Sequence, residues 1–167
     1  MIRYLVLIIF CNLICAYTVS DAVGQNGLVV SSKAEASKVG IDVLRNGGNA
    51  IDAAVAVAFA LSVTHPSAGN LGGGGFMVIR LADGTVTTID FREKAPIESS
   101  KNMFLDSLGI VIPGRSWSTA LASGVPGTVA GLGYAHEKYG SMNWFDLVYP
   151  SVVLAKFGYP LDYFNVN

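Results

Sequence analysis

A run of four consecutive glycines, Gly72–Gly75, constrains the fold of this chain more than any other feature. Glycine loses more backbone freedom on folding than other residues do. Such a run is therefore favoured only where the backbone approaches another segment closely or adopts a positive φ. The run lies between an apolar stretch, residues 51–63, and a stretch with strand character, residues 76–81. We expect it to let a helix end pack closely against a central strand.

The residues that follow the glycines predict a β-hairpin. Phe76–Leu81 and Thr85–Phe91 are two short strand segments, and the Asp83-Gly84 pair between them is typical of a hairpin turn. The second segment alternates with a period of two between the set Val86, Thr88, Asp90 and the set Thr87, Ile89, Phe91. This strand delivers Arg92 to its end.

The rest of the chain predicts apolar helices with few strands. We expect helices over residues 34–45, 51–63, 126–139 and 142–149, with Pro150 opening or kinking a further turn or two that Gly158 ends. Ser32 and Glu35 form a capping-box pattern, and Asn49 can cap the second helix with Asp52 in its first turn. A third strand is expected over residues 27–30, and a loop from Pro96 to about Ala120 with a turn at Pro113-Gly114.

Composition excludes two classes of protein. Hydrophobic residues make up 51% of the 167 residues and charged residues only 14%, which excludes a disordered chain. The formal net charge is -1 and there is no basic run, so nucleic-acid binding has no electrostatic basis here.

The first twenty residues resemble a signal peptide. Arg3 is followed by the apolar run Leu5–Cys15 and by the small residues of Ala16–Ser20, where cleavage is expected. The expected localisation is therefore secreted or periplasmic. The alternative is a membrane anchor formed by the same segment left uncleaved, although the apolar run is short for a spanning helix.

Both cysteines, Cys11 and Cys15, lie within this leader. The mature chain then has no disulfide, no thiolate metal site and no cysteine nucleophile. The only histidines, His65 and His136, are far apart in sequence and have no motif around them, so we expect no metal site.

A glycine run can belong to a phosphate-binding or dinucleotide-binding loop, but the residues around this run do not fit either motif. No lysine followed by serine or threonine comes after the run, as a phosphate-binding loop needs, and Met77 stands where a dinucleotide fingerprint needs glycine. The run also precedes a strand rather than a helix. Gly114–Ser118 ends in serine and lies in a loop, so it is not a hydrolase nucleophile elbow.

Two roles are consistent with the position of Arg92 in the sequence. It can form a structural ion pair with Glu93, Asp90 or Glu98. Alternatively, its planar guanidinium can grip the α-carboxylate of a substrate through two parallel hydrogen bonds. Composition alone favours the structural ion pair.

Five motifs in order resemble the amino-terminal part of the γ-glutamyltransferases, a family also called glutathione hydrolase proenzymes. They are Ala34–Ala36, Gly47–Ala54, Asn70–Phe76, Asp90–Glu93 followed by Ala95-Pro96, and Ser123–Leu132. The resemblance covers nearly all of the chain after about residue 27.

The resemblance implies an α+β fold, a part of the αββα sandwich of amino-terminal-nucleophile hydrolases. In this family the precursor cuts itself into a large and a small subunit, and the new amino-terminal threonine of the small subunit is the nucleophile. The enzyme transfers the γ-glutamyl group of glutathione to water, an amino acid or a peptide and needs no cofactor. The arginine of its Asp-Phe-Arg-Glu motif, here Arg92, binds the α-carboxylate of the donor.

One departure from the family limits these expectations. The family's nucleophile lies in a Thr-Thr-His triplet, whereas Thr87-Thr88 is followed here by Ile89. We therefore expect residues 21–167 to be the amino-terminal part of the large subunit, with no catalytic residue and no activity alone. The expected partners are the small subunit of the same precursor and γ-glutamyl compounds such as glutathione. The open alternatives are a related acylase, a poly-γ-glutamate depolymerase, and an inert truncated product.

Overall fold

A computed structural model describes residues 21–161; the predicted leader, residues 1–20, lies outside the described residues, as do residues 162–167. In chain order the elements are α2 (Ala34–Arg45), α3 (Ala50–Thr64), β1 (Phe76–Arg80), β2 (Val86–Asp90), the 3-10 helix η1 (Ala120–Ala122), α4 (Thr128–Tyr139) and α5 (Trp144–Phe157). The mixture confirms the α+β class. Between residues 21 and 161, no helix is long and apolar enough to cross a membrane.

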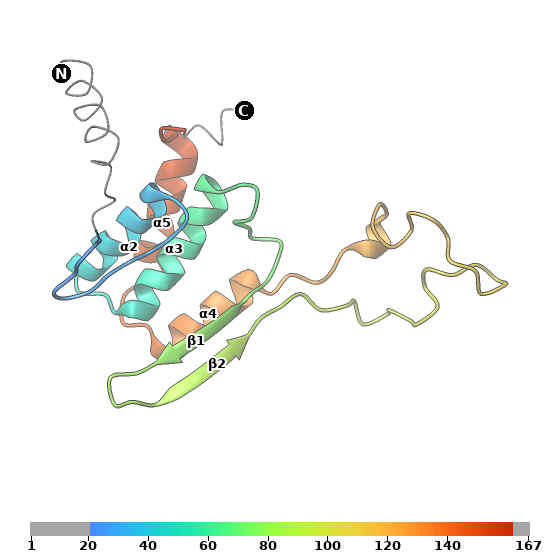
Figure 1. Ribbon diagram of the computed structural model, residues 1–167, viewed down its shortest axis with the longest axis horizontal. Helices are drawn as coiled ribbons and strands as arrows, with labels where there is room; N and C mark the ends of the chain where they lie inside the picture. The colour runs from blue at the N-terminus through green and yellow to red at the C-terminus, as the bar shows by residue number, and fades with distance from the viewer. Residues whose placement is uncertain (1–20, 162–167) are drawn as a thin grey trace, which may run out of the picture.

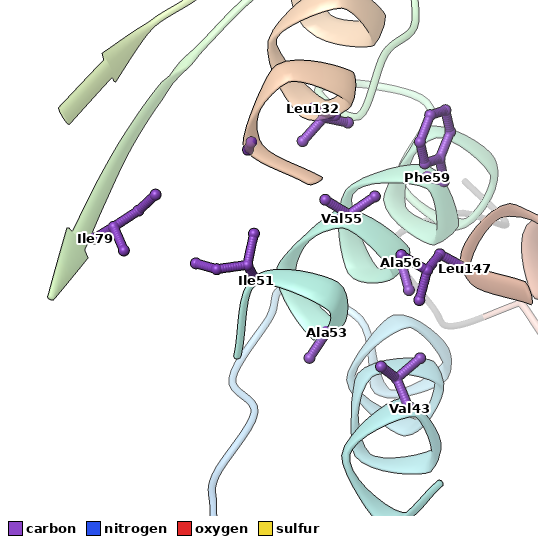
Figure 2. Close-up of a cluster of buried hydrophobic side chains, with 10 residues drawn as sticks. Val43, Ile51, Ala53, Val55, Ala56, Phe59, Ile79, Leu132 and Leu147 are labelled. Atoms are coloured by element: carbon purple, nitrogen blue, oxygen red, sulfur yellow. The ribbon is translucent and has the colours of Figure 1, made fainter. Parts of the chain in front are cut away.

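Helix α3 is the centre of the helical layer (Figure 1). It packs against α2, α4 and α5, and the buried core is built largely on its side chains, as Figure 2 shows for Val55, Ala56 and Phe59. Although Ala54 is exposed, α3 is covered on most of its faces. This is close to what we expect for a helix without a polar face.

The cap of α3 is as predicted, and that of α2 is not. Asn49 accepts hydrogen bonds from the backbone amides of Ile51 and Asp52, and Asp52 accepts one from the amide of Asn49 in return. The predicted capping box of Ser32 and Glu35 is wrong. Helix α2 begins after Lys33 without a side-chain cap.

The predicted strand over residues 27–30 is also wrong. This segment has no strand partner in the part of the chain that the structure describes. Of its side chains only Val29 is partly buried, with its methyl groups lying against Gly40 of α2, whereas Leu28 and Val30 are exposed. The apolar sequence thus predicted a strand that does not form among the described residues, because a strand requires a neighbour to pair with.

The predicted hairpin is confirmed. Strands β1 and β2 pair antiparallel with Phe76 opposite Asp90, and Gly84 takes a positive φ of 87° in the turn. Figure 2 shows Ile79 of β1 directed toward Ile51, and Met77 and Ile89 also face the core. The opposite face is exposed and partly apolar; it carries Phe76, Val78, Val86 and Thr88.

Helices α4 and α5 follow the predicted segments with shifted ends. Helix α4 begins at Thr128, two residues after the predicted start, and Gly140 caps its end. Helix α5 continues through Pro150 to Phe157 and ends at Gly158. The predicted loop after Pro96 extends away from the helices (Figure 1) and turns at Gly114, whose φ is 79°.

A buried carboxylate joins α3 to the turn between α4 and α5. Asp52 of α3 is fully buried. It accepts hydrogen bonds from the Ser141 hydroxyl (2.6 Å), the Ser141 amide and the Met142 amide, in the turn between α4 and α5. Burial opposes ionisation of Asp52, but these hydrogen bonds and that from the Asn49 amide outweigh it, so the pKa of Asp52 lies below its ordinary value.

Loss of this carboxylate is expected to destabilise the helical layer. Asp52→Asn should lower the free energy of unfolding by about 2–4 kcal/mol at neutral pH, because its amide group places donors against donors in a buried site. Denaturant unfolding of the 167-residue chain measures this. Asp42→Asn, at an exposed pair with Lys38, is the matched control and should change stability far less.

The pH dependence of stability follows from the lowered pKa of Asp52. A carboxyl with a lower pKa in the folded state contributes fully above its unfolded pKa, and the contribution is lost as the pH falls through the folded pKa. Stability should therefore decrease as the pH falls below about 4, and Asp52→Asn should flatten that decrease. An equally steep decrease in the variant would contradict the assignment.

Candidate functional site

The glycine run makes the predicted close approach, but to the start of α4 and to the chain after β2. The carbonyl of Gly73 accepts hydrogen bonds from the amides of Gly127 (2.8 Å) and Thr128 (3.0 Å). Asn70 binds both sides of this contact, because its Oδ1 accepts from the Gly73 amide and from the Thr128 hydroxyl. The first free amides of α4 are thus satisfied by the glycine run.

Phe91 lies between glycines from both segments. It exchanges two backbone hydrogen bonds with Gly75, which extends the hairpin by one residue pair. A Cβ atom added at Gly74 would lie 2.6 Å from the Phe91 carbonyl oxygen. A Cβ at Gly127 would overlap that carbonyl, and one at Gly131 would overlap the base of the Phe91 side chain. Only residues without a side chain permit this packing.

Arg92 follows directly from this packed residue and is exposed. It lines a pocket of about 350 Å³ between the end of the hairpin and α4, together with Lys94, Val125 and Tyr134. Its guanidinium forms no ion pair or hydrogen bond with any residue between 21 and 161. The structural ion pairs considered for Arg92 with Asp90, Glu93 or Glu98 are therefore not formed in the described chain.

The backbone on either side of Arg92 is held. The Asp90 Oδ1 atom accepts a hydrogen bond from the Arg92 amide at 3.0 Å. Two residues on, Lys94 exchanges backbone hydrogen bonds of 3.2 and 2.8 Å with Val125. The arrangement presents a free planar cation on a fixed backbone, which can bind a carboxylate through two hydrogen bonds.

The two histidines take part in local structure, as expected. His65 is the C-cap residue of α3. His136 lies on α4, with its Nε2 atom 2.8 Å from the Met142 carbonyl oxygen. Within residues 21–161 there is no group of three or more histidine, cysteine or acidic side chains that could hold a metal ion.

Three supporting residues lie within motifs named from the sequence, but their structural role was not predicted. Asn70, Gly127 and Gly131 join the glycine run, Phe91 and α4. The sequence held a signal for the glycines, because two glycines four residues apart lie on one helix face and allow a neighbour to approach. It held none for Asn70 as a bridge, because one of its two partners, Thr128, lies far along the chain.

A family model described as gamma-glutamyltranspeptidase matches residues 36–164. The chain belongs to the gamma-glutamyltranspeptidase family. Curated relatives include the glutathione hydrolase proenzymes of Pseudomonas sp. strain A14, 54% identical over 159 residues, and of Escherichia coli K12, 53% identical over 135 residues. These matches cover 94% and 81% of this chain but only 28% and 23% of the relatives. The chain thus spans about a quarter of their length.

Solved structures of the family share the fold. The gamma-glutamyltranspeptidase of Helicobacter pylori is 53% identical with a TM-score of 0.80, covering 84% of this chain and 40% of that chain. The enzyme of Pseudomonas nitroreducens, solved in complex with L-DON, is 42% identical with a TM-score of 0.79, covering 86% and 43%. The expected fold, part of an amino-terminal-nucleophile hydrolase, is confirmed.

Two glycines of α4 give a matched test of the close packing. Gly131→Ala should lower the free energy of unfolding by about 2 kcal/mol or more, because its methyl group would overlap Phe91. Gly133→Ala, with no atom within 4 Å of its added Cβ, should stabilise the chain by about 0.5–1 kcal/mol through helix propensity. Thermal or denaturant unfolding compares them; equal effects would contradict the packing of Phe91 on α4.

Proposed function

We propose that this chain is the donor-binding part of a glutathione hydrolase, also called a γ-glutamyltransferase. The enzyme transfers the γ-glutamyl group of glutathione to water, an amino acid or a peptide, and Arg92 binds the α-carboxylate of the donor. The observation that carries the proposal is the guanidinium of Arg92 at an open pocket, which forms no ion pair or hydrogen bond with any of residues 21–161. Its position in the Asp-Phe-Arg-Glu motif of the family supports the same role.

The chemistry of the donor fits this site. The glutamyl end of glutathione carries an α-carboxylate, and an arginine binds a carboxylate with two parallel hydrogen bonds. Lys94 adds a second positive charge to the pocket wall. Because the hairpin, the glycine run and α4 fix the backbone around Arg92, a bound carboxylate would set the position of the γ-carbonyl carbon relative to the nucleophile.

The nucleophile is proposed to lie on another part of the enzyme. This chain holds no Thr-Thr-His triplet, and its curated relatives are proenzymes several times longer. The proposed partner is a small subunit cut from the same precursor, whose amino-terminal threonine attacks the γ-carbonyl carbon. The 167-residue chain is therefore expected to be inactive by itself.

A related transpeptidase is the second candidate. The Bacillus anthracis transpeptidase CapD is 33% identical with a TM-score of 0.64, covering 83% of this chain. A cephalosporin acylase of Bacillus halodurans, 23% identical, shares the fold alone. A free arginine at the pocket favours donors that carry an α-carboxylate, which supports a γ-glutamyl donor over an acylase substrate. We further propose that residues 1–20 direct the protein to a secreted or periplasmic location.

The role of Arg92 is tested in a chimera that joins this chain to a complete enzyme. In the chimera, the segment of this chain that matches the Escherichia coli glutathione hydrolase proenzyme replaces its 135-residue counterpart. Arg92→Lys should raise the KM for glutathione by about tenfold or more with a smaller change in kcat, because lysine keeps the charge but loses the planar fork.

The matched control is Arg80→Lys, at an exposed arginine on β1 at the other end of the hairpin. It should leave the KM for glutathione within about twofold. An unchanged KM in the Arg92→Lys chimera would contradict the proposed role of Arg92.

A further inference from the structure

We propose that Asp90 is the positioning residue for Arg92: its side chain holds the Arg92 backbone amide at the point where β2 ends and so directs the guanidinium into the pocket. The inference rests on the proposed role of Arg92 in donor binding. Asp90 would not need to touch the donor. It would act through the residue that does.

The hydrogen bonds around Arg92 leave this one contact to fix its amide. Strand β2 ends at Asp90. Phe91 still exchanges two hydrogen bonds with Gly75, and Lys94 exchanges two with Val125. Between these anchored residues, the Arg92 amide donates to the Asp90 Oδ1 atom at 3.0 Å. A side chain that accepts from the amide two residues on forms an Asx turn, which ends a strand and turns the backbone.

This turn fixes the backbone from which the Arg92 side chain reaches the pocket. Val86, Thr88 and Asp90 lie on the exposed face of β2, and Arg92 is exposed as they are. Asp90 and Arg92 both line the pocket formed with Val125 and Tyr134 at the end of the hairpin, so the turn holds the Arg92 backbone beside that pocket. An arginine on a straight, unpaired chain end would sample many orientations, and binding a carboxylate would then cost more conformational entropy.

The acceptor oxygen of Asp90, rather than its charge, carries the proposed effect. Asp90 and Arg92 line the same pocket, yet the carboxylate forms no ion pair with the guanidinium among the described residues. It therefore leaves the guanidinium available to a donor. Asparagine offers the same Oδ1 acceptor and forms the same turn, so the two residue types separate hydrogen bonding from charge.

The hairpin contains its own control. At its other end, the Asp83 Oδ1 atom accepts from the Thr85 amide at 2.8 Å, which is the same kind of turn on a residue that is also exposed. Loss of Asp83 removes a local hydrogen bond from the same two strands without touching the pocket.

The experiment compares Asp90→Ala, Asp90→Asn and Asp83→Ala in the chimera. Asp90→Ala should raise the KM for glutathione by about five- to tenfold with kcat within about twofold, because the arginine is less well placed but the reacting groups are unchanged. Asp90→Asn should recover most of the loss, and Asp83→Ala should leave the KM unchanged. Cleavage of the precursor into two subunits confirms that each variant is folded.

Other results would overturn the inference. A KM unaffected by Asp90→Ala would show that Asp90 does not position Arg92, and an Asp90→Asn variant as impaired as Asp90→Ala would show that the charge matters instead. If Asp83→Ala raised the KM equally, the effect would be general to the hairpin. In each of these cases, a raised KM in the Arg92→Lys variant would still support the proposed function. An unchanged KM in the Arg92→Lys variant would instead contradict the proposed function itself, and with it this inference.

A second measurement does not need turnover. Amide hydrogen exchange at Arg92, measured by NMR in the 167-residue chain, should be faster in Asp90→Ala than in the unchanged chain and slow again in Asp90→Asn. Equal exchange rates in all three would contradict the turn.

Discussion

The close contact of Phe91 with glycines from two segments is the constraint on which the candidate site depends. The glycine run covers one side of the Phe91–Glu93 backbone. Gly127, the N-cap residue of α4, covers another side of it, and Gly131 of α4 packs on the Phe91 side chain. Because the Gly73 carbonyl also caps the first amides of α4, hairpin and helix are joined by backbone atoms rather than by long side chains. Backbone contacts have little freedom to shift. The backbone of the next residue, Arg92, is therefore held in a fixed position.

The helical layer holds α4 in place against the hairpin. Helix α3 fills the space between α2, α4 and α5 with apolar side chains (Figures 1 and 2), and Asp52 ties its first turn to the turn after α4. The buried charge of Asp52 is tolerated because backbone amides and the Ser141 hydroxyl donate hydrogen bonds to its carboxylate. The position of α4, and hence of the pocket wall that faces Arg92, is therefore set by the core and by a buried hydrogen-bond network together.

Local sequence signals predicted the elements well and their partners poorly. The α2 boundaries, the Asn49 cap and the hairpin follow from periodicity and turn residues that act over a few positions. The strand over residues 27–30 and the Ser32 cap failed because each depends on a neighbour that short-range patterns do not specify. Arg92 became a candidate through its place at the end of a strand and through the family motif, whereas the role of Asn70 and Gly127 depends on contacts between residues more than fifty positions apart in sequence.

The central claim, that Arg92 holds the carboxylate of a γ-glutamyl donor, is tested most directly by a crystal structure of the chimera with L-glutamate bound. The account predicts both carboxylate oxygens of the α-carboxylate at about 2.7–3.0 Å from guanidinium nitrogens of Arg92. An α-carboxylate bound elsewhere, with Arg92 paired to an acidic side chain of the enzyme, would contradict the account.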